Sequence, residues 1–254
     1  MAAIPTLGIA SPLTKGKRVT VAQGRLNGKN IFKRDFLEGP VDGEFGEQTG
    51  RACRRAKFWL GYPTQELKAT YGQTLDAYLT GKAPLTGEMK KRKAAREKKA
   101  AQMPLREKAL AEAHKYVGVK ESPAGSNKVR FSDWYGIRGP WCAMFVCWCY
   151  VNGAKSKAFM KSSRYAYVPY IVADARAGRN GLSVTRDPKP GDVVCFDWQG
   201  DGVPDHVGLF KPGNATSFAT IEGNTAVGND SNGGAVMERT RNASSRPVFV
   251  RVGR

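Results

Sequence analysis

The N-terminal third of the chain alternates short apolar runs with polar turns. Runs at 19–26 and 75–79, and a longer amphipathic run at 49–60, predict three helices. A polar turn at 39–46 separates the first two runs, and Gly61-Tyr62-Pro63 stops the helix predicted at 49–60. We therefore predict a small all-α domain over residues 15–86.

Residues 105–254 combine helical patterns with strand patterns. The helices are expected at 105–117, 140–151 and 165–177. After Pro190-Gly191-Asp192 the pattern changes to short apolar strands, expected at 193–196, 206–210, 219–222, 236–238 and 248–250. Helices followed by an antiparallel sheet predict an α+β domain.

Residues 87–104 differ from both neighbouring regions. Lysine and arginine dominate this segment, interrupted by alanines and Glu97. The basic residues are Lys90, Lys91, Arg92, Lys93, Arg96, Lys98 and Lys99. We predict a helix-compatible basic linker, which is either a solvated spacer or an additional electrostatic attachment to an anionic surface.

Composition narrows the class of protein. The chain has 254 residues, 41% of them hydrophobic and 25% charged, which fits two folded domains rather than a disordered chain. The net charge of +19 favours a polyanionic partner: a nucleic acid, an anionic membrane surface or a bacterial wall with acidic polymers. No segment approaches the roughly 20 apolar residues of a membrane helix. The first residues lack the apolar core of a signal peptide, so we expect folding in the cytoplasm.

Cys142 is the candidate nucleophile among five cysteines. Their odd number and irregular spacing predict free thiols rather than a disulfide framework. Pro140 suits the first turn of a helix, which places Cys142 where unpaired backbone N–H groups and the helix dipole stabilise a thiolate. Cys147 and Cys149 fit better as small residues of the core.

A thiolate that attacks an amide also needs a base that later protonates the departing amine. The chain has two histidines. His114 lies within a predicted helix and is expected at the surface or in packing, whereas His206 begins an apolar strand after a loop and is the candidate base. Glu222 and Asn224 alternate to the same face of the next predicted strand, so either can orient the imidazole, and Glu222 is favoured.

Several short motifs across residues 105–254 carry a family resemblance. They are Glu121 to Asn127, Trp134-Tyr135-Gly136, Pro140-Trp141-Cys142-Ala143, Pro190-Gly191-Asp192, Asp205-His206-Val207-Gly208 and Glu222-Gly223-Asn224-Thr225. In order and spacing they resemble the CHAP domain, the cysteine, histidine-dependent amidohydrolase/peptidase family of bacteriophage endolysins and bacterial autolysins. The resemblance implies a papain-like α+β fold, cleavage of peptidoglycan amide bonds and accumulation in the host cytoplasm before lysis. Some CHAP domains have an Asp-rich calcium loop before the cysteine and a Gln immediately preceding the cysteine. The resemblance does not extend to these two features, because residues 131–135 stand in place of the loop and Trp141 stands in place of the Gln.

The N-terminal region is similar to the small helical peptidoglycan-binding domain found beside many wall hydrolases. The matching residues are Val21-Ala22-Gln23, Leu26, the turn from Gly39 to Gly46, Thr49, Ala52 and Leu60-Gly61-Tyr62-Pro63. Glycines in this turn supply backbone angles that other residues resist, and Phe45 is expected to pack the turn onto the helices. The resemblance implies wall binding by residues 15–86, with a purely structural domain as the alternative.

No metal ion and no cofactor are expected. The segment that begins at Asp197 resembles the start of an EF-hand loop, but Gly208 stands where the bidentate glutamate is required, so a plain turn is predicted. The cysteines and histidines do not have the spacing of a zinc site.

These observations predict an endolysin-type peptidoglycan hydrolase in which Cys142 attacks an amide carbonyl and His206 protonates the departing amine. N-acetylmuramoyl-L-alanine amidase and peptide endopeptidase specificities both stay open, as do the host and the oligomeric state. We expect peptidoglycan and anionic wall polymers as partners, no specific nucleic acid, and action on the wall after the membrane is permeabilised. The alternatives are a non-catalytic wall-binding or virion structural protein and a basic nucleic-acid-binding protein.

Overall fold

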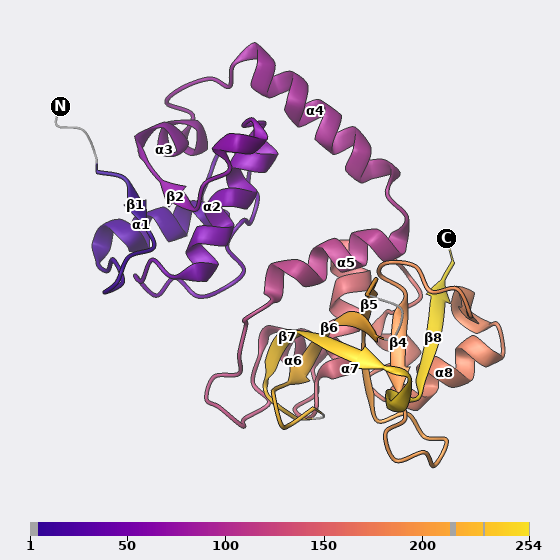
Figure 1. Ribbon diagram of the computed structural model, residues 1–254. Coiled ribbons are helices and arrows are strands. Elements are labelled where there is room, and N and C mark those ends of the chain that lie inside the picture. The colour runs from indigo at the N-terminus through magenta and orange to yellow at the C-terminus, as the bar shows by residue number, and fades with distance from the viewer. Residues whose placement is uncertain (1–4, 214–216, 231, 254) are drawn as a thin grey trace. The chain divides into compact units, whose positions relative to one another are not determined.

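The computed structural model describes residues 5–213, 217–230 and 232–253 (Figure 1). The chain divides into two compact units, Met1–Gln102 and Met103–Arg254, and each has its own hydrophobic core. Within the described residues, no helix combines the length and the apolar character needed to cross a membrane.

The N-terminal unit is mainly helical. Helices α1 (Lys17–Leu26), α2 (Glu47–Leu60) and α3 (Gln73–Thr80) confirm the three predicted helices. The unit also contains a two-stranded antiparallel ladder, β1 (Leu7–Gly8) with β2 (Thr70–Tyr71), so the expected all-α architecture misses this pairing. Two-residue strands are too short to leave a period-2 pattern in the sequence.

The turn between α1 and α2 packs as expected. Phe45 is fully buried in the N-terminal core, and Gly43 has a φ of 77°. Gln23 of α1 is buried and holds this turn: its Nε2 donates to Asp42 Oδ1 at 2.8 Å and to Thr49 Oγ1 at 3.0 Å. Its Oε1 accepts the backbone N–H of Gly43 at 2.8 Å. One amide side chain therefore fixes the turn to both helices.

The basic segment forms helix α4 (Gly87–Gln102), and it packs on α2 instead of standing free as a linker. Met89 is buried in the N-terminal core. Arg92 Nε donates to the carbonyl of Gly61 at 2.7 Å, and Arg96 Nη2 donates to that of Tyr62 at 2.8 Å. These two carbonyls lie just beyond the end of α2, where backbone acceptors lack helical partners. Part of the basic character therefore serves the fold of this unit.

The C-terminal unit contains a six-stranded antiparallel sheet and several helices. The helices are α5 (Leu105–Tyr116), α6 (Arg130–Tyr135), α7 (Cys142–Trp148), which continues as a π-helical turn (Cys149–Gly153), and α8 (Val168–Arg176). The strands are β3 (Leu182–Val184), β4 (Val193–Phe196), β5 (His206–Lys211), β6 (Ser217–Thr225), β7 (Ala235–Asn242) and β8 (Pro247–Val252), in the order β3-β8-β4-β5-β6-β7. This confirms the mixed helix-and-sheet prediction, to which the structure adds α6 and β3.

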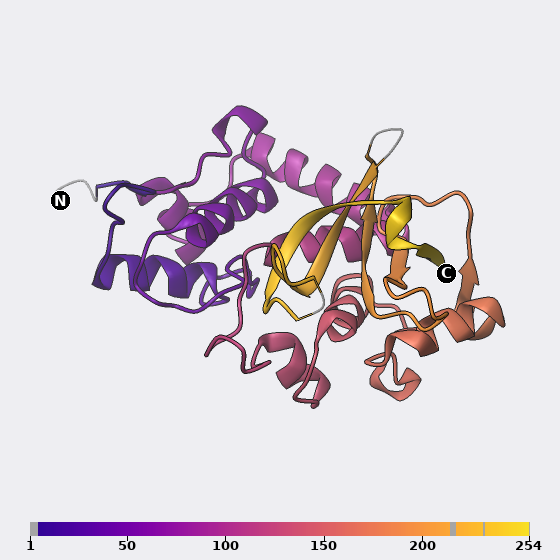
Figure 2. The same ribbon diagram turned by 60° about the horizontal axis from the view of Figure 1, so that its bottom comes forward.

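The two faces of the sheet have different contents. Helix α7 packs on β5 and β6, and α8 packs on β3 and β8, so the main core lies between helices and sheet (Figure 2). Val207 and Leu209 of β5 face this core. Because strand side chains alternate, the opposite face carries a separate aromatic cluster that includes Phe196, Trp198 and Phe210. The candidate catalytic residues come from three elements: Cys142 is the first residue of α7, His206 is the first residue of β5, and Glu222 lies on β6.

Candidate active site

Cys142 lies in the first turn of α7, as predicted, but the helix begins at Cys142 with Trp141 as its N-cap, so Pro140 precedes the helix instead of lying in its first turn. Its side chain is buried except for a 5% exposed fraction, and it borders a cleft of about 700 Å³. The first backbone N–H groups of a helix lack helical partners, so they can stabilise negative charge on the thiol or on a substrate oxygen beside it. Cys142 is thus both held in place and open to a ligand.

His206 is the first residue of β5 and is fully buried. Its Nε2 lies 3.1 Å from Oε2 of Glu222. Its other ring nitrogen, Nδ1, is buried and has no hydrogen-bond partner of ordinary geometry among the described residues, which leaves it available to the thiol. Burial lowers the pKa of His206, but Cys142 and then Glu222 raise it more strongly, to about 9. This environment favours the protonated form of the His206 imidazole beside the Cys142 side chain.

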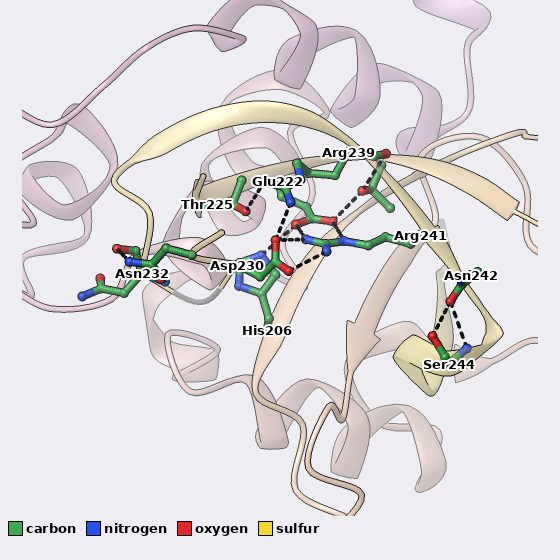
Figure 3. Close-up of polar contacts among 11 residues, drawn as sticks. His206, Glu222, Thr225, Asp230, Asn232, Arg239, Arg241, Asn242 and Ser244 are labelled. Atoms are coloured by element: carbon green, nitrogen blue, oxygen red, sulfur yellow. Dashed lines mark hydrogen bonds and ion pairs between the residues drawn. The ribbon is translucent and has the colours of Figure 1, made fainter. Parts of the chain in front are cut away.

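Glu222 lies on β6 with both carboxylate oxygens engaged (Figure 3). Oε1 accepts hydrogen bonds from Thr220 Oγ1 at 2.5 Å and Arg241 Nε at 2.8 Å. Oε2 accepts from Arg241 Nη2 at 2.5 Å and contacts His206. Burial raises the pKa of Glu222, but the hydrogen bonds from Arg241 and His206 outweigh it and hold the pKa near 2. Glu222 is therefore a buried, ionised partner for the imidazole.

Asn224 occupies a different position from the one that strand alternation predicts. The pairing of β6 with β7 shifts register between Glu222 and Thr225, and Asn224 has a φ of 59°. Its side-chain Nδ2 donates to Oδ1 of Asn232 at 3.2 Å. The bulge therefore removes the simple alternation that placed Asn224 on the face of Glu222. This geometry favours Glu222 as the orienting residue, and the catalytic roles themselves stay predictions.

Two glycines make the contact between α7 and the sheet possible. A Cβ atom at Gly223 would lie 2.7 Å from Phe145 Cβ and 2.8 Å from Trp141 Cζ3, both in the helix or just before it. A Cβ atom at Gly208 would lie 2.6 Å from Cγ of Glu222, which pairs with Gly208 across the strands. All three distances are shorter than any normal carbon contact. The absence of two side chains thus lets the thiol and the carboxylate approach His206 together.

The residue before the nucleophile is also fixed. Trp141 is fully buried, stacks on Phe131 with ring centroids 5.5 Å apart, and donates through Nε1 to Glu121 Oε1 at 2.8 Å. The other oxygen of Glu121 accepts the backbone N–H of Asn127 at 3.0 Å. Glu121, predicted only as part of a motif, therefore anchors the entry into α7.

The remaining cysteines and His114 lie outside this arrangement. Cys53, Cys147, Cys149 and Cys195 are free and fully buried, and burial raises the pKa of each thiol. The expected core role of Cys147 and Cys149 is confirmed. The side chain of His114 is 44% exposed, and its Nδ1 lies 3.4 Å from Oε1 of Glu238, as a surface position predicts.

The cleft beside Cys142 has aromatic and basic walls. Tyr167 and Tyr170 are 55% and 42% exposed and contact each other edge to face with centroids 5.1 Å apart. Lys161 and Arg164 line the same cleft, and Asp205 is the acidic residue in its lining. Apolar walls with a few charged groups are typical of ligand-binding clefts. The cleft can therefore admit a ligand beside the thiol.

The segment after Asp197 forms turns held by its own carboxylates. Asp197 accepts the backbone N–H groups of Gly200 at 2.7 Å and Gly202 at 3.0 Å, and Asp201 accepts that of Val203 at 2.9 Å. Residues 131–135 lie in α6, where Asp133 pairs with Arg138 at 2.8 Å. Across the described part of the chain, no three His, Cys, Asp or Glu side chains gather in a way that could hold a metal ion.

Sequence reasoning missed Arg241, Asp230 and Thr220. Arg241 lies on β7, beyond the strand predicted at 236–238, and its exposed fraction is 8%. The sequence signal that could have revealed Arg241 is an arginine on a strand next to a strand with a buried glutamate. An arginine at a buried strand position requires an anionic partner. The register that pairs β6 with β7 cannot be read from local spacing.

Residues 134–224 match the CHAP domain family. The matched segment contains Cys142, His206 and Glu222 and ends at Asn224, whereas Asp230 and Arg241 lie outside it. The match supports an amidase or peptidase that acts on peptidoglycan. A search of curated proteins found no match to the chain.

Proposed function

We propose that the chain is an endolysin-type peptidoglycan hydrolase that cleaves a wall amide bond with Cys142 as nucleophile. The observation that carries the proposal is the buried His206, placed between a thiol at an open cleft and an ionised Glu222. A purely structural histidine needs no thiol that opens into a peptide-sized cleft. The same proposal includes a papain-like fold for the C-terminal, catalytic unit.

The acylation half of the reaction follows from this geometry. The Cys142 sulfur attacks the amide carbonyl carbon, and the carbonyl oxygen becomes an oxyanion that the backbone N–H of Cys142 can stabilise. Collapse of the tetrahedral intermediate breaks the C–N bond. The imidazolium of His206 gives its proton to the departing amine, so a neutral amine leaves and the acyl group stays on sulfur as a thioester.

Deacylation reverses these roles. The now neutral His206 takes a proton from a water molecule that attacks the thioester carbonyl, and the thiolate leaves as the carboxylic acid forms. Glu222 stabilises the imidazolium that reforms beside it. The scissile bond is either the amide between the lactyl group of muramic acid and L-alanine or an amide within the peptides. Both bonds suit this chemistry.

For the N-terminal unit we propose wall binding. Its support is the packed Asp42–Gly46 turn, together with the basic helix α4 that belongs to this unit. In this proposal the protein accumulates in the host cytoplasm and reaches the wall after the membrane is permeabilised. Residues 1–102 with a fluorescent tag, once shown to be folded by circular dichroism, should sediment with purified sacculi and bind less at high salt. Failure to sediment at low salt would contradict wall binding.

Mass spectrometry of digested peptidoglycan tests the catalytic proposal. Wild-type protein and Cys142→Ala are incubated with sacculi of several wall chemotypes, and new termini are identified. We expect wild type alone to release fragments: a free lactyl carboxyl group identifies an amidase, and a new peptide amine identifies an endopeptidase. Release by Cys142→Ala would remove Cys142 as nucleophile. No release from any chemotype would refute the hydrolase proposal.

A further inference from the structure

Arg241 donates two hydrogen bonds to Glu222, the partner of the catalytic histidine. Its guanidinium forms a two-pronged contact with Glu222, in which Nε donates to Oε1 at 2.8 Å and Nη2 donates to Oε2 at 2.5 Å. Oε2 is also the oxygen that lies 3.1 Å from His206 Nε2. A bidentate arginine fixes the plane of a carboxylate as well as its charge. Arg241 therefore sets the direction in which Glu222 meets the imidazole.

Arg241 is itself held on several sides (Figure 3). Asp230 accepts from Nη2 at 3.2 Å and lies 3.1 Å from Nη1 through its second oxygen. The guanidinium carbon lies 5.5 Å from the ring centroid of Phe196 and 5.4 Å from that of Trp198. The imidazole of His206 stacks on the same two rings. The arginine and the histidine thus share one aromatic support.

Arg241 and His206 both favour the ionised form of Glu222, and the hydrogen bonds from Arg241 are the larger contribution. A fully buried carboxylate with only neutral partners takes up a proton, because the ionised form loses its hydration. A protonated Glu222 would no longer stabilise an imidazolium. We propose that Arg241, held by Asp230, is a positioning residue that keeps Glu222 ionised and aligned, so that Glu222 directs His206 toward Cys142. The inference rests on the proposed Cys142 chemistry, and Arg241 does not line the cleft.

The test measures the rate at which iodoacetamide alkylates Cys142 as a function of pH, in wild type, Arg241→Met and Arg241→Lys. Arg251→Met is the matched control, because Arg251 also binds a fully buried carboxylate, donating through Nη2 to Asp192 Oδ2 at 2.6 Å. We expect the pH midpoint of alkylation to rise by about one unit or more in Arg241→Met. Arg241→Lys, which keeps the charge without the two-pronged contact, should shift less, and Arg251→Met should not shift.

A merely structural role gives a different result. Thermal unfolding first establishes that Arg241→Met is folded. The inference is overturned if this folded variant has the same pH midpoint of alkylation as Arg251→Met. If Arg241→Met does not fold, Arg241→Lys decides the question through the same midpoint. Wall hydrolysis adds a second readout, since kcat should fall at least tenfold while KM stays unchanged. Alkylation needs no wall substrate, so an inactive wild type would refute the proposed function and leave this inference to be judged on the midpoint.

A second inference concerns the basic residues of the cleft. Lys161 and Arg164 have no carboxylate within 4.0 Å among the described residues, and their contacts are with aromatic rings. Lys161 Nζ lies 5.3 Å from the centroid of Trp134, and the Arg164 guanidinium carbon lies 5.4 Å from that of Tyr170. The acidic residue in the lining, Asp205, already accepts the backbone N–H of Trp198 at 2.8 Å. Among the described residues, the cleft therefore presents two positive charges that form no ion pair, together with the single carboxylate of Asp205.

An anionic ligand group best satisfies these two charges. A free carboxyl group is an anion at neutral pH, whereas its amide is neutral, so only the free form can pair with these two cations. We infer that Lys161 and Arg164 bind a free carboxylate of the substrate peptide, so that the enzyme acts on an acidic peptide in preference to its amidated form. This inference rests on the proposed function, because it places the peptide in the cleft beside Cys142.

Two wall fragments that differ only in amidation of one peptide carboxyl group provide the test. We expect wild type to cleave the acid form with the lower KM. Lys161→Met and Arg164→Met should each raise that KM by roughly fivefold, the upper end expected of an exposed ion pair, and should leave the amidated fragment unaffected. Lys157→Met, an exposed lysine outside the cleft, is the control and should change neither value.

An unchanged preference in both cleft variants would overturn the inference. If wild type cleaves neither fragment, calorimetric binding of both fragments to Cys142→Ala separates the two failures. If Cys142→Ala binds the acid form more tightly and the added substitution Arg164→Met removes this difference, the subsite is supported although the hydrolase proposal fails. Equal binding of the two fragments would overturn the subsite as well.

Discussion

The contact between α7 and β6 depends on Gly223, and alanine there should damage stability and catalysis together. The added Cβ would lie 2.7 Å from Phe145 Cβ and 2.8 Å from Trp141 Cζ3. Ordinary carbon contacts begin near 3.4 Å, so α7 would have to move by about 0.7 Å or the rings would have to rotate. The φ angle of Gly223 is not in the left-handed region, so crowding rather than backbone strain is the cause.

The expected size follows from this overlap. Overpacking of a tight contact typically costs about 1–3 kcal/mol, and we expect Gly223→Ala to lose that much free energy of unfolding. The same movement displaces Cys142 relative to His206, because Cys142 begins α7 and His206 lies on the neighbouring strand. A misplacement of about 1 Å can cost on the order of a hundredfold in rate, so a fall in kcat of roughly ten- to a hundredfold is expected.

Two assays check the prediction on the same variant. Urea unfolding gives the stability change, and clearing of a sacculus suspension at a temperature well below the transition gives the rate. Gly139→Ala is the control for stability, because a Cβ there meets no atom within 4 Å. A Gly223→Ala protein with wild-type stability and wild-type rate would refute the claim that this glycine sets the distance between helix and sheet.

Three further predictions concern the titrating groups. Because Cys142 and Glu222 raise the pKa of His206 to about 9, kcat/KM should fall as the pH rises through that value and the departing amine loses its proton donor; a profile that stays flat there would contradict the assignment. Iodoacetamide should label one thiol per native chain and none in Cys142→Ala, since burial raises the pKa of the other four thiols; intact-mass analysis counts the labels. Glu222, whose pKa is lowered from 4.5 to about 2, should contribute on the order of 3 kcal/mol above pH 4.5 that is lost toward pH 2, and Glu222→Gln should flatten that part of the stability curve.

The elements with strong local patterns were predictable from the sequence. Helices α1, α2 and α5 and strands β4 and β5 lie within a few residues of their predicted bounds, because the helices have a buried apolar face and the strands are continuous apolar runs buried on both faces. The position of Cys142 at a helix start was predictable for the same local reason, since Pro140 cannot lie in a helix interior. The local sequence was sufficient to predict a helix, a strand or the position of a residue wherever that feature depends on one segment alone.

The features that the sequence did not reveal depend on distant partners. Helix α4 resembles a free basic spacer until its arginines meet the carbonyls of Gly61 and Tyr62. The bulge after Glu222 moves Asn224 out of the predicted alternation, and bulges leave no periodic signal. Arg241 pairs with Phe218 across β6 and β7, and its side chain reaches Glu222, 19 positions earlier in the chain. Strand register decides the positions of Asn224 and Arg241, and packing on α2 decides that of α4, so local propensity decides none of the three.

Gly208 and Gly223, two of the glycines in the resemblance motifs, have a common physical meaning. Gly208 follows His206 by two residues, on the same strand face, and pairs with Glu222, where any side chain would strike the carboxylate stem. Gly223 faces the opposite way and receives α7. One glycine therefore makes room for the acid on one side of the sheet, and the other makes room for the helix that carries the thiol. The side chain of a strand residue points to one face of the sheet only. His206 can therefore contact both Cys142 and Glu222 only if Gly208 and Gly223 carry no side chain. The spacing of the motifs is thus a packing requirement of the site, which is why substitution at Gly223 should affect rate and stability together.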